Sequence, residues 1–311
     1  MRLSRWGQSP YETDADISLE REALGRLVDV RERGTDAEIV VVHSKIPMGP
    51  SEHAKAPSMR MLVTTTSGTD HIDREYFLDA GVAVARLPEA RRDAVVDTTI
   101  GSLIWGLRRI GSMQAYAANN HWARGRLPEM GPVGLAGARI GVIGLGVIGS
   151  RVAEVLSALG AEVFGSDPRG VPVEVADCTV ERMMSSCDAV TLHCDLNATT
   201  RRMMNREFLE TASPDLVLVN TARGDIVDVD AAVDLAVHER IGGLILDVFP
   251  TEPWQSMAVD SPRVLLMPHA AGYHRDLAAC VRSGLLAAVE AFVSDEPIPH
   301  RLDADRDSGC S

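Results

Sequence analysis

Three side chains in the second half of the chain have the types that the reduction of a carbonyl group would need. Arg223, Glu252 and His269 each follow a short apolar run that is typical of a strand. An arginine can hold a carboxylate and polarise a neighbouring carbonyl. A histidine can deliver a proton to the developing alkoxide, and a glutamate beside it can hold the imidazole and raise its pKa. Together they predict the reduction of a 2-keto acid.

Each of these residues also has an ordinary interpretation. Arg223 could be a surface arginine, Glu252 a solvated loop acid and His269 a structural histidine. Their shared position favours chemistry, because an open α/β sheet presents its site where its strands end. The nearby Asp228 and Asp230 are typical of solvated loop acids or helix caps.

A dinucleotide-binding motif precedes these residues. The stretch 139–167 contains an apolar run, the glycines Gly144, Gly146 and Gly149, a helix-like segment, a second apolar run and Asp167. The first glycine permits a tight turn, the second allows the pyrophosphate to approach, and the third allows close packing. Asp167 would accept hydrogen bonds from the adenosine ribose and favours NAD over NADP. Arg169 could instead accept a 2′-phosphate.

The elements that must position these residues alternate along the chain. Six short strands from residue 140 to residue 267 are separated by helical stretches, which predicts a parallel doubly wound sheet. Before them, residues 1–97 predict a smaller α/β unit with strands at 28–30, 38–42, 61–65 and 82–85 and a helix at 19–27. Long helices are expected at 97–110 and 276–293, and a frayed tail at 295–311. Asp73 is expected to cap the helix that follows it.

The overall composition limits the classes of partner. The net charge is −13, which disfavours nucleic acid and anionic membranes as general partners. No run approaches the roughly 18 apolar residues of a membrane span, and the N-terminus lacks the apolar core of a signal peptide. The five cysteines form no metal-like cluster, so we expect reduced thiols, no metal and a cytoplasmic protein.

Taken together, these motifs resemble the D-isomer-specific 2-hydroxyacid dehydrogenase family over about residues 60–294. The resemblance rests on SGTDHID at 67–73, VIGLGVIG at 142–149, VTLHC at 190–194, NTARGDIVD, LDVFPTEP and MPHAAG. It implies a two-domain α/β fold, in which a Rossmann-type doubly wound sheet is joined to a smaller flavodoxin-like substrate domain. The substrate domain would be discontinuous, with residues 1–97 and 275–311, and the NAD-binding domain would cover 98–274. The active site would lie in the cleft between them.

The resemblance also implies roles for individual residues. Arg223, Glu252 and His269 match the catalytic residues, and Asp247 would meet the nicotinamide carboxamide. The residues expected to bind the cofactor are Gly144, Gly146, Val147, Ile148, Gly149, Asp167, Pro168, Arg169, His193, Cys194, Thr221, Ala222, Asp247 and Gly272. The residues that the resemblance implies for substrate binding are Thr66, Ser67, Gly68 and Thr69, through backbone N–H groups. Arg91 and Lys45 are also expected to bind the substrate, because of their charge and position and not because of the resemblance. A homodimer through the NAD-binding domain is implied, with Trp122 in its arm.

The chain departs from the family in several places. The segment between Val30 and Glu38 is too short for the usual helix, which affects the expected order of the strands. Asp195 replaces a common proline, and we expect no regulatory domain of the kind that many phosphoglycerate dehydrogenases carry after the core. Arg91 replaces a common asparagine just before the first hinge helix. We hypothesise that Arg91 binds a second anionic group on the substrate, such as a phosphate or phosphonate, with help from His43 and Lys45; Arg91 could instead be a solvated loop residue.

Several functions fit this pattern. The favoured one is NADH-dependent, reversible reduction of a 2-keto acid to a D-2-hydroxy acid, on a substrate that could carry a second anionic group. A 4-phosphoerythronate- or phosphoglycerate-type dehydrogenase is an alternative. A second is an NAD-responsive, non-catalytic protein of the corepressor kind. A formate-type enzyme would carry a glutamine where Glu252 stands, whereas the motifs leave phosphite oxidation open.

Overall fold

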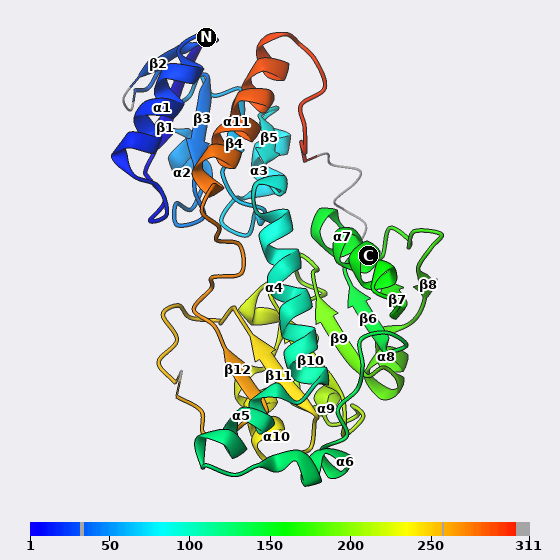
Figure 1. The fold of residues 1–311 in the computed structure, drawn as a ribbon. Coiled ribbons are helices and arrows are strands. Elements are labelled where there is room, and N and C mark those ends of the chain that lie inside the picture. The colour runs from blue at the N-terminus through cyan, green and yellow to red at the C-terminus, as the bar shows by residue number, and fades with distance from the viewer. Residues whose placement is uncertain (32–33, 257, 303–311) are drawn as a thin grey trace. The chain divides into compact units, whose positions relative to one another are not determined.

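A computed structural model describes residues 1–31, 34–256 and 258–302 and divides the chain into two compact units (Figure 1). Unit 1 contains Met1–Asp93 and the segment that begins at Tyr273, and unit 2 contains Ala94–Gly272. Both units are α/β with wholly parallel sheets, as predicted.

Unit 1 is a five-stranded sheet in the order β2-β1-β3-β4-β5. Alternate residues of its strands face opposite sides, so Ile39 and Val41 pack under α1 and α11, whereas Val40 and Val42 pack against α3. Figure 1 shows α1 and α11 side by side on one face. The elements are β1 (Arg2–Trp6), α1 (Asp14–Leu24), β2 (Asp29–Arg31), β3 (Ile39–Val42), α2 (Pro50–His53), β4 (Met61–Thr64), α3 (Arg74–Asp79), β5 (Ala83–Arg86) and α11 (Leu277–Val293).

The first strand of unit 1 was not predicted. β1 is the second strand from the edge of the sheet, and it carries Arg5 in the middle of a polar-looking run. The Arg5 guanidinium donates to Glu20 at 2.5 Å and to Glu12 at 2.5 Å, and all three side chains are largely buried. A charged residue can lie in a covered sheet when partners this close in space compensate it, and those partners are distant in sequence. The short connection between β2 and β3 leaves the flavodoxin-like strand order intact.

Two other predictions for unit 1 need correction. Helix α1 begins at Asp14, five residues before the predicted start, because Thr13 caps it in a capping box with Asp16. The start of the predicted frayed tail is ordered, because Leu302 is buried and its N–H donates to the Val84 carbonyl at 2.8 Å. The rest of the tail lies outside the described residues. Asp73 caps α3 by accepting from Tyr76 N–H, as predicted.

Unit 2 is a seven-stranded sheet in the order β12-β11-β10-β9-β6-β7-β8, the doubly wound arrangement with one strand more than predicted. The additional strand, β8, has only two exposed residues and therefore lacks an apolar signal. Helices α4 and α7 cover one face of the sheet, and α8 and α10 cover the other. The elements are β6 (Arg139–Ile143), α7 (Val147–Ala158), β7 (Glu162–Ser166), β8 (Ala176–Asp177), α8 (Val180–Ser186), β9 (Ala189–Leu192), α9 (Arg206–Leu209), β10 (Val217–Asn220), η2 (Gly224–Ile226), α10 (Val229–Val237), β11 (Gly243–Leu246) and β12 (Val264–Leu266).

The long helix predicted at 97–110 is longer at its start and interrupted at its end. Helix α4 (Glu89–Leu107) begins eight residues earlier, directly after Pro88, and it therefore includes Arg91. Arg91 was predicted to precede this helix, and that placement is wrong. The helix stops before Arg109, whose left-handed backbone (φ 54°) turns the chain into α5 (Ile110–Ala118). A short η1 (Ala123–Arg126) and α6 (Leu127–Met130) lead to β6.

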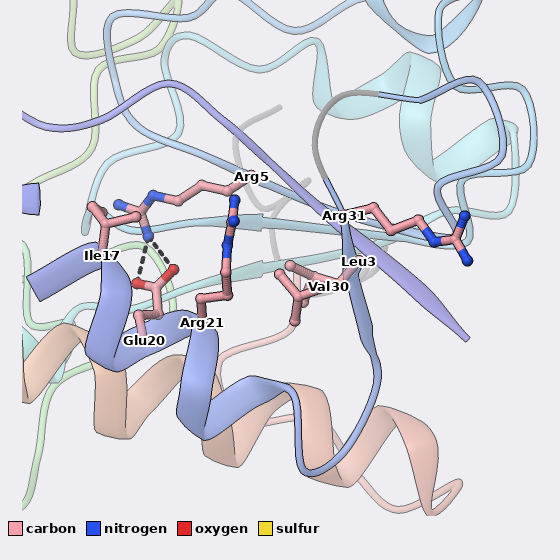
Figure 2. A pocket seen from close by; sticks show the side chains of 7 residues that line it. All are labelled: Leu3, Arg5, Ile17, Glu20, Arg21, Val30 and Arg31. Atoms are coloured by element: carbon pink, nitrogen blue, oxygen red, sulfur yellow. Dashed lines mark hydrogen bonds and ion pairs between the residues drawn. The ribbon is translucent and has the colours of Figure 1, made fainter.

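A hollow of about 360 Å³ lies between α1 and the strands β1 and β2 of unit 1 (Figure 2). Figure 2 shows the Arg5 guanidinium turned toward the Glu20 carboxylate at one side of it. Glu12 and Glu20 compensate the charge of Arg5 at this side of the hollow. None of the predicted site residues is among those that line it: Leu3, Arg5, Ile17, Glu20, Arg21, Val30 and Arg31.

Among the described residues, no helix is long and apolar enough to cross a bilayer.

Candidate functional site

The glycine turn in unit 2 has the geometry that a bound pyrophosphate requires. Gly144 has φ +88° and lies so close to the Cys194 backbone that a Cβ would come within 2.5 Å of its nitrogen. A Cβ at Gly149 would lie 1.9 Å from the Gly144 carbonyl oxygen, so the third glycine lets α7 pack against the turn itself. No side chain among the described residues caps the start of α7, so the N–H groups of Val147 and Ile148 can bind an anion.

Asp167 follows β7 at the position predicted to contact the ribose. Its carboxylate accepts the Leu145 N–H at 2.7 Å and pairs with both Nε and Nη2 of Arg169 at 3.0 and 3.1 Å. Burial alone would raise the pKa of Asp167, but the hydrogen bonds from Arg169 and Leu145 outweigh it and hold this pKa below its usual range. In the sequence, Asp167 favoured NAD and Arg169 could have favoured NADP. In the structure, the two side chains are paired with each other. Pro168 lies between them on the exposed turn.

Two predicted cofactor residues follow β9 and are uncharged at neutral pH. Burial lowers the pKa of His193 to about 4, and its Nε2 lies 3.0 Å from the Thr191 hydroxyl. Burial raises the pKa of Cys194 to about 12. These two uncharged residues therefore pack against the glycine turn. The next residue, Asp195, is exposed, and its carbonyl accepts from the Thr200 hydroxyl at 2.7 Å.

His269 and Glu252 form a pair at the ends of neighbouring strands. His269 Nδ1 lies 2.7 Å from Glu252 Oε2, while Oε1 accepts the Phe249 N–H at 3.1 Å. Burial works to raise the pKa of Glu252, but the hydrogen bond and charge of His269, the Phe249 N–H and the nearby Arg223 lower it overall. Glu252 is therefore held as a carboxylate in the charge state that orients an imidazole.

Asp247, at the end of β11, shapes the backbone around His269. Its buried carboxylate accepts the N–H groups of Ala270 at 2.8 Å and Ala271 at 2.9 Å, and its carbonyl accepts the His269 N–H at 2.8 Å. These bonds hold His269 in a left-handed backbone conformation, with φ 55°. Burial raises the pKa of Asp247 in spite of the two N–H donors. The predicted contact with a nicotinamide remains a prediction, as does the role of Gly272 just beyond this turn.

Arg223 lies on the turn after β10, and a buried asparagine shapes that turn. Asn220 Nδ2 donates to the Arg223 carbonyl at 2.8 Å, and its Oδ1 accepts the Ala222 N–H at 3.0 Å. A Cβ on Gly224 would lie 1.9 Å from the Phe249 carbonyl carbon, so only glycine allows this turn to approach the segment that carries Glu252. The predicted Thr221 contributes its hydroxyl, 3.3 Å from that of Thr99 on α4.

Asn220 shapes the site, although the motifs in the sequence did not predict it as a site residue. Its signal was present in the order of the residues, because a polar amide ends the buried run of β10 and is itself fully buried. A buried amide needs hydrogen-bond partners, and a turn supplies them. Within unit 2, His269 is thus paired with Glu252, and Arg223 lies near enough to lower the pKa of Glu252.

The predicted substrate loop, residues 66–69, follows β4 in unit 1. Within the described part of the chain, the N–H groups of these four residues donate to no protein acceptor. Consecutive N–H groups without acceptors can bind an anion together where they converge, because each retains an unused donor. A carboxylate has the size and charge that such a loop can hold.

The other predicted substrate residues lie in the same unit. Arg91 Nη1 donates to the Thr65 carbonyl at 2.5 Å. Burial lowers the pKa of Arg91, and the nearby Glu12 and Tyr11 oppose that effect. Lys45 is exposed, and its backbone N–H donates to His43 Nδ1 at 3.2 Å. Arg91 is thus joined to the substrate loop through one of its three guanidinium nitrogens.

Comparisons with known proteins agree with this geometry. Residues 100–271 match the model of the D-isomer specific 2-hydroxyacid dehydrogenase, NAD binding domain. Unit 2 is accordingly an NAD-binding domain, and the predicted cofactor, NAD, is confirmed by this family match.

Related proteins extend the similarity into unit 1. The chain is 32% identical to the erythronate-4-phosphate dehydrogenase of Salinibacter ruber, an alignment covering 85% of this chain and 66% of that protein. It is 31% identical to the glyoxylate/hydroxypyruvate reductase HPR3 of Arabidopsis thaliana, covering 86% and 84%. Its fold matches the D-lactate dehydrogenase of Aquifex aeolicus, solved with NAD and lactic acid, with TM-score 0.79, 23% identity and coverage of 95% and 96%. The chain thus spans slightly less than two thirds of the first relative.

Proposed function

This chain belongs to the D-isomer specific 2-hydroxyacid dehydrogenase family, and we propose that it reduces a 2-keto acid to a D-2-hydroxy acid with NADH. The observation that carries this proposal is the His269–Glu252 pair, 2.7 Å apart, beside Arg223 in an NAD-binding domain. The reverse reaction uses the same groups, because proton transfer by an acid is reversible.

Each residue has a defined part in the proposed reaction. Bound NADH supplies a hydride, which reduces the carbonyl carbon. Arg223 holds the substrate carboxylate and draws electron density toward the carbonyl oxygen. Because Nδ1 of His269 is used by Glu252, delivery of the proton to that oxygen falls to Nε2. Glu252 stabilises the imidazole orientation and the positive charge that His269 carries before it gives up the proton.

The proposed cofactor contacts are those of the glycine turn and of the residues around it. The N–H groups of Val147 and Ile148 would hold the pyrophosphate at the start of α7, which has no side-chain cap within residues 1–31, 34–256 and 258–302. Asp167 would hold the adenosine ribose, with Arg169 moving aside from its present contact. The remaining proposed contacts, made from the other strand ends of unit 2 and the turn after β7, are Gly144, Gly146, Gly149, Pro168, His193, Cys194, Thr221, Ala222, Asp247 and Gly272.

For the substrate, we propose a 2-keto acid with a second anionic group. The loop at 66–69 would hold the carboxylate through its N–H groups. Arg91 would hold the second group through Nε and Nη2, since Nη1 is already bonded to Thr65, and Lys45 would add a positive charge. Similarity to an erythronate-4-phosphate dehydrogenase supports a phosphorylated substrate.

A substrate panel tests this function. NADH oxidation would be followed by absorbance with pyruvate, glyoxylate, hydroxypyruvate, 3-phosphonopyruvate and the 2-keto acid of 4-phosphoerythronate. We expect turnover with at least one of them and the highest kcat/KM with a dianionic substrate. Binding of NADH without turnover of any would favour the alternative, an NAD-responsive non-catalytic protein.

We also propose that the chain forms a homodimer through unit 2. The indole of Trp122 lies between α5 and η1 and is 89% exposed, which is unusual for a tryptophan. Burial against a second copy would account for it. Sedimentation equilibrium should give a dimer, and Trp122→Ser should shift the protein toward a monomer; a monomeric wild-type protein would contradict this.

A further inference from the structure

The substrate loop in unit 1 uses every one of its carbonyl groups. Three side chains donate to carbonyls here: Arg91 Nη1 to Thr65 at 2.5 Å, Arg86 Nη1 to Ser67 at 3.1 Å and the Thr66 hydroxyl to Gly68 at 3.0 Å. Two backbone N–H groups take the other carbonyls, that of Leu87 bonding to Thr66 at 3.1 Å and that of Ile72 bonding to Thr69 at 2.9 Å. The N–H groups of residues 66–69, in contrast, have no acceptor in the described part of the chain. The acceptors of the loop are satisfied by the protein, and its donors are not.

A chain of three side chains leads into this loop. His71 Nε2 lies 3.1 Å from the Thr64 hydroxyl, which lies 2.9 Å from the Thr66 hydroxyl, which donates to the Gly68 carbonyl. Thr64 is fully buried at the end of β4. None of these contacts involves unit 2, so the arrangement belongs to unit 1 alone.

The direction of each hydrogen bond in the series from His71 to Gly68 follows from the number of hydrogens that each group can donate. A carbonyl can only accept, so the single hydroxyl hydrogen of Thr66 points to Gly68. The Thr64 hydroxyl must then donate to Thr66, which uses its own single hydrogen. Only His71 Nε2 is left to donate to Thr64, so this nitrogen carries a proton. The tautomer of His71 is therefore set by a backbone carbonyl two side chains away.

We propose that His71 and Thr64 are positioning residues for an anion site. The hydrogen bonds that lead from His71 through Thr64 end at the Gly68 carbonyl, while Arg86, Arg91 and two backbone N–H groups take the other carbonyls of residues 65–69. The N–H groups of residues 66–69 are then left for the substrate carboxylate. This inference rests on the proposed function, which supplies the carboxylate. Neither His71 nor Thr64 touches the ligand; they act through the loop. Satisfied acceptors keep the loop in the one conformation whose donors face an anion, which reduces the ordering that binding requires.

Substitutions of Thr64 test whether the hydrogen bonds from His71 to Gly68 support anion binding. Thr64→Val keeps the shape but removes the hydroxyl, whereas Thr64→Ser keeps the hydroxyl. We expect Thr64→Val to raise KM for the 2-keto acid about ten-fold, because a lost hydrogen bond has about that effect. The carboxylate is held in the ground state and in the transition state alike, so kcat should change less than about two-fold. Thr64→Ser should recover most of the affinity, and NADH binding should be unchanged. Equal impairment of both variants would overturn the proposal.

A direct binding measurement separates this inference from the proposed function. Oxalate would be titrated into ¹⁵N-labelled protein while the amide signals of residues 66–69 are followed, which needs no turnover. We expect these signals to move in the wild type, with an oxalate Kd about ten-fold weaker in Thr64→Val. Ser4→Ala is the control and should match the wild type, because it removes a buried hydroxyl of β1 for which the described part of the chain supplies no hydrogen-bond partner. Unmoved loop amides would overturn the anion site, even if keto acids are turned over.

The tautomer of His71 can be measured in the unmodified protein, so the test does not depend on how a variant folds. Imidazole ¹⁵N chemical shifts distinguish a protonated from an unprotonated ring nitrogen. The chain requires Nε2 of His71 to be protonated. A neutral His71 that carries its proton on Nδ1 would overturn the inference.

Discussion

The Nδ1 atom of His269 lies 2.7 Å from Oε2 of Glu252, while the Glu252 Oε1 atom accepts the Phe249 N–H. The carboxylate is thus fixed from two sides, and it fixes the imidazole in turn. Arg223 is close enough to lower the pKa of Glu252 as well. A guanidinium, a carboxylate and an imidazole therefore lie near one another in unit 2. This relationship gives the proposed reaction its acid.

Loss of the imidazole should remove the proton donor. His269→Ala should lower kcat by about two to four orders of magnitude, the usual contribution of a general acid. NADH affinity should stay within about two-fold, because the cofactor contacts lie elsewhere in unit 2. Single-turnover and steady-state assays with the best 2-keto acid would measure this. Near-normal turnover would exclude His269 from the mechanism.

The turn after β10 should depend on Asn220. Asn220→Ala removes the amide that joins the Ala222 N–H to the Arg223 carbonyl, and it leaves both groups buried without that partner. We expect kcat/KM to fall at least about ten-fold, and the free energy of unfolding to fall by about 1–3 kcal/mol. Steady-state kinetics and urea unfolding would measure the two effects. A stable variant with unchanged kcat/KM would show that Arg223 needs no such support.

Cofactor preference should depend on the Asp167–Arg169 pair. Asp167→Ala removes the proposed ribose acceptor and releases Arg169 toward a 2′-phosphate. NADH should bind about ten-fold or more weakly, whereas NADPH should be affected less or should improve. Fluorescence titrations with both cofactors give the ratio. Unchanged NADH affinity would mean that Asp167 serves only the Leu145 N–H and Arg169.

The same acid should make stability depend on pH. The pKa of Asp167 is lowered in the folded protein, so its contribution is present above the unfolded pKa of about 4 and is lost as the pH falls through the folded value. Asp167→Asn should therefore lower Tm at pH 7, and the difference from wild type should shrink as the pH falls from about 5 to 3. Thermal unfolding of the cofactor-free protein at several pH values would measure it. A constant difference in Tm would argue against the charge.

The second-anion proposal rests on Arg91. Arg91→Ala should lower kcat/KM for 3-phosphonopyruvate by about ten-fold or more beyond its effect on pyruvate, since a charged hydrogen bond contributes about 1.5–3 kcal/mol. Part of the loss should be common to both substrates, because Arg91 also holds the Thr65 carbonyl. Equal losses on both substrates would leave Arg91 only this shared role.

Much of this protein follows from the sequence because its signals are local. The glycine turn is recognisable because its requirements, a positive φ and close approach, act on consecutive residues. Arg223, Glu252 and His269 could be grouped because parallel strands end at one edge of a sheet, so the ends of buried runs lie close together. The caps at Asp73 and Asp228 are local for the same reason.

Only the tertiary structure decided the features that depend on distant partners. Strand β1 escaped recognition because Arg5 is compensated by Glu12 and Glu20, which are brought to it by folding. Asp167 and Arg169 were alternatives in the sequence, and their geometry made them a pair. The role of Arg91 at Thr65 and the chain from His71 to Gly68 depend on distances of about 3 Å between side chains and a loop, which no spacing along the chain encodes.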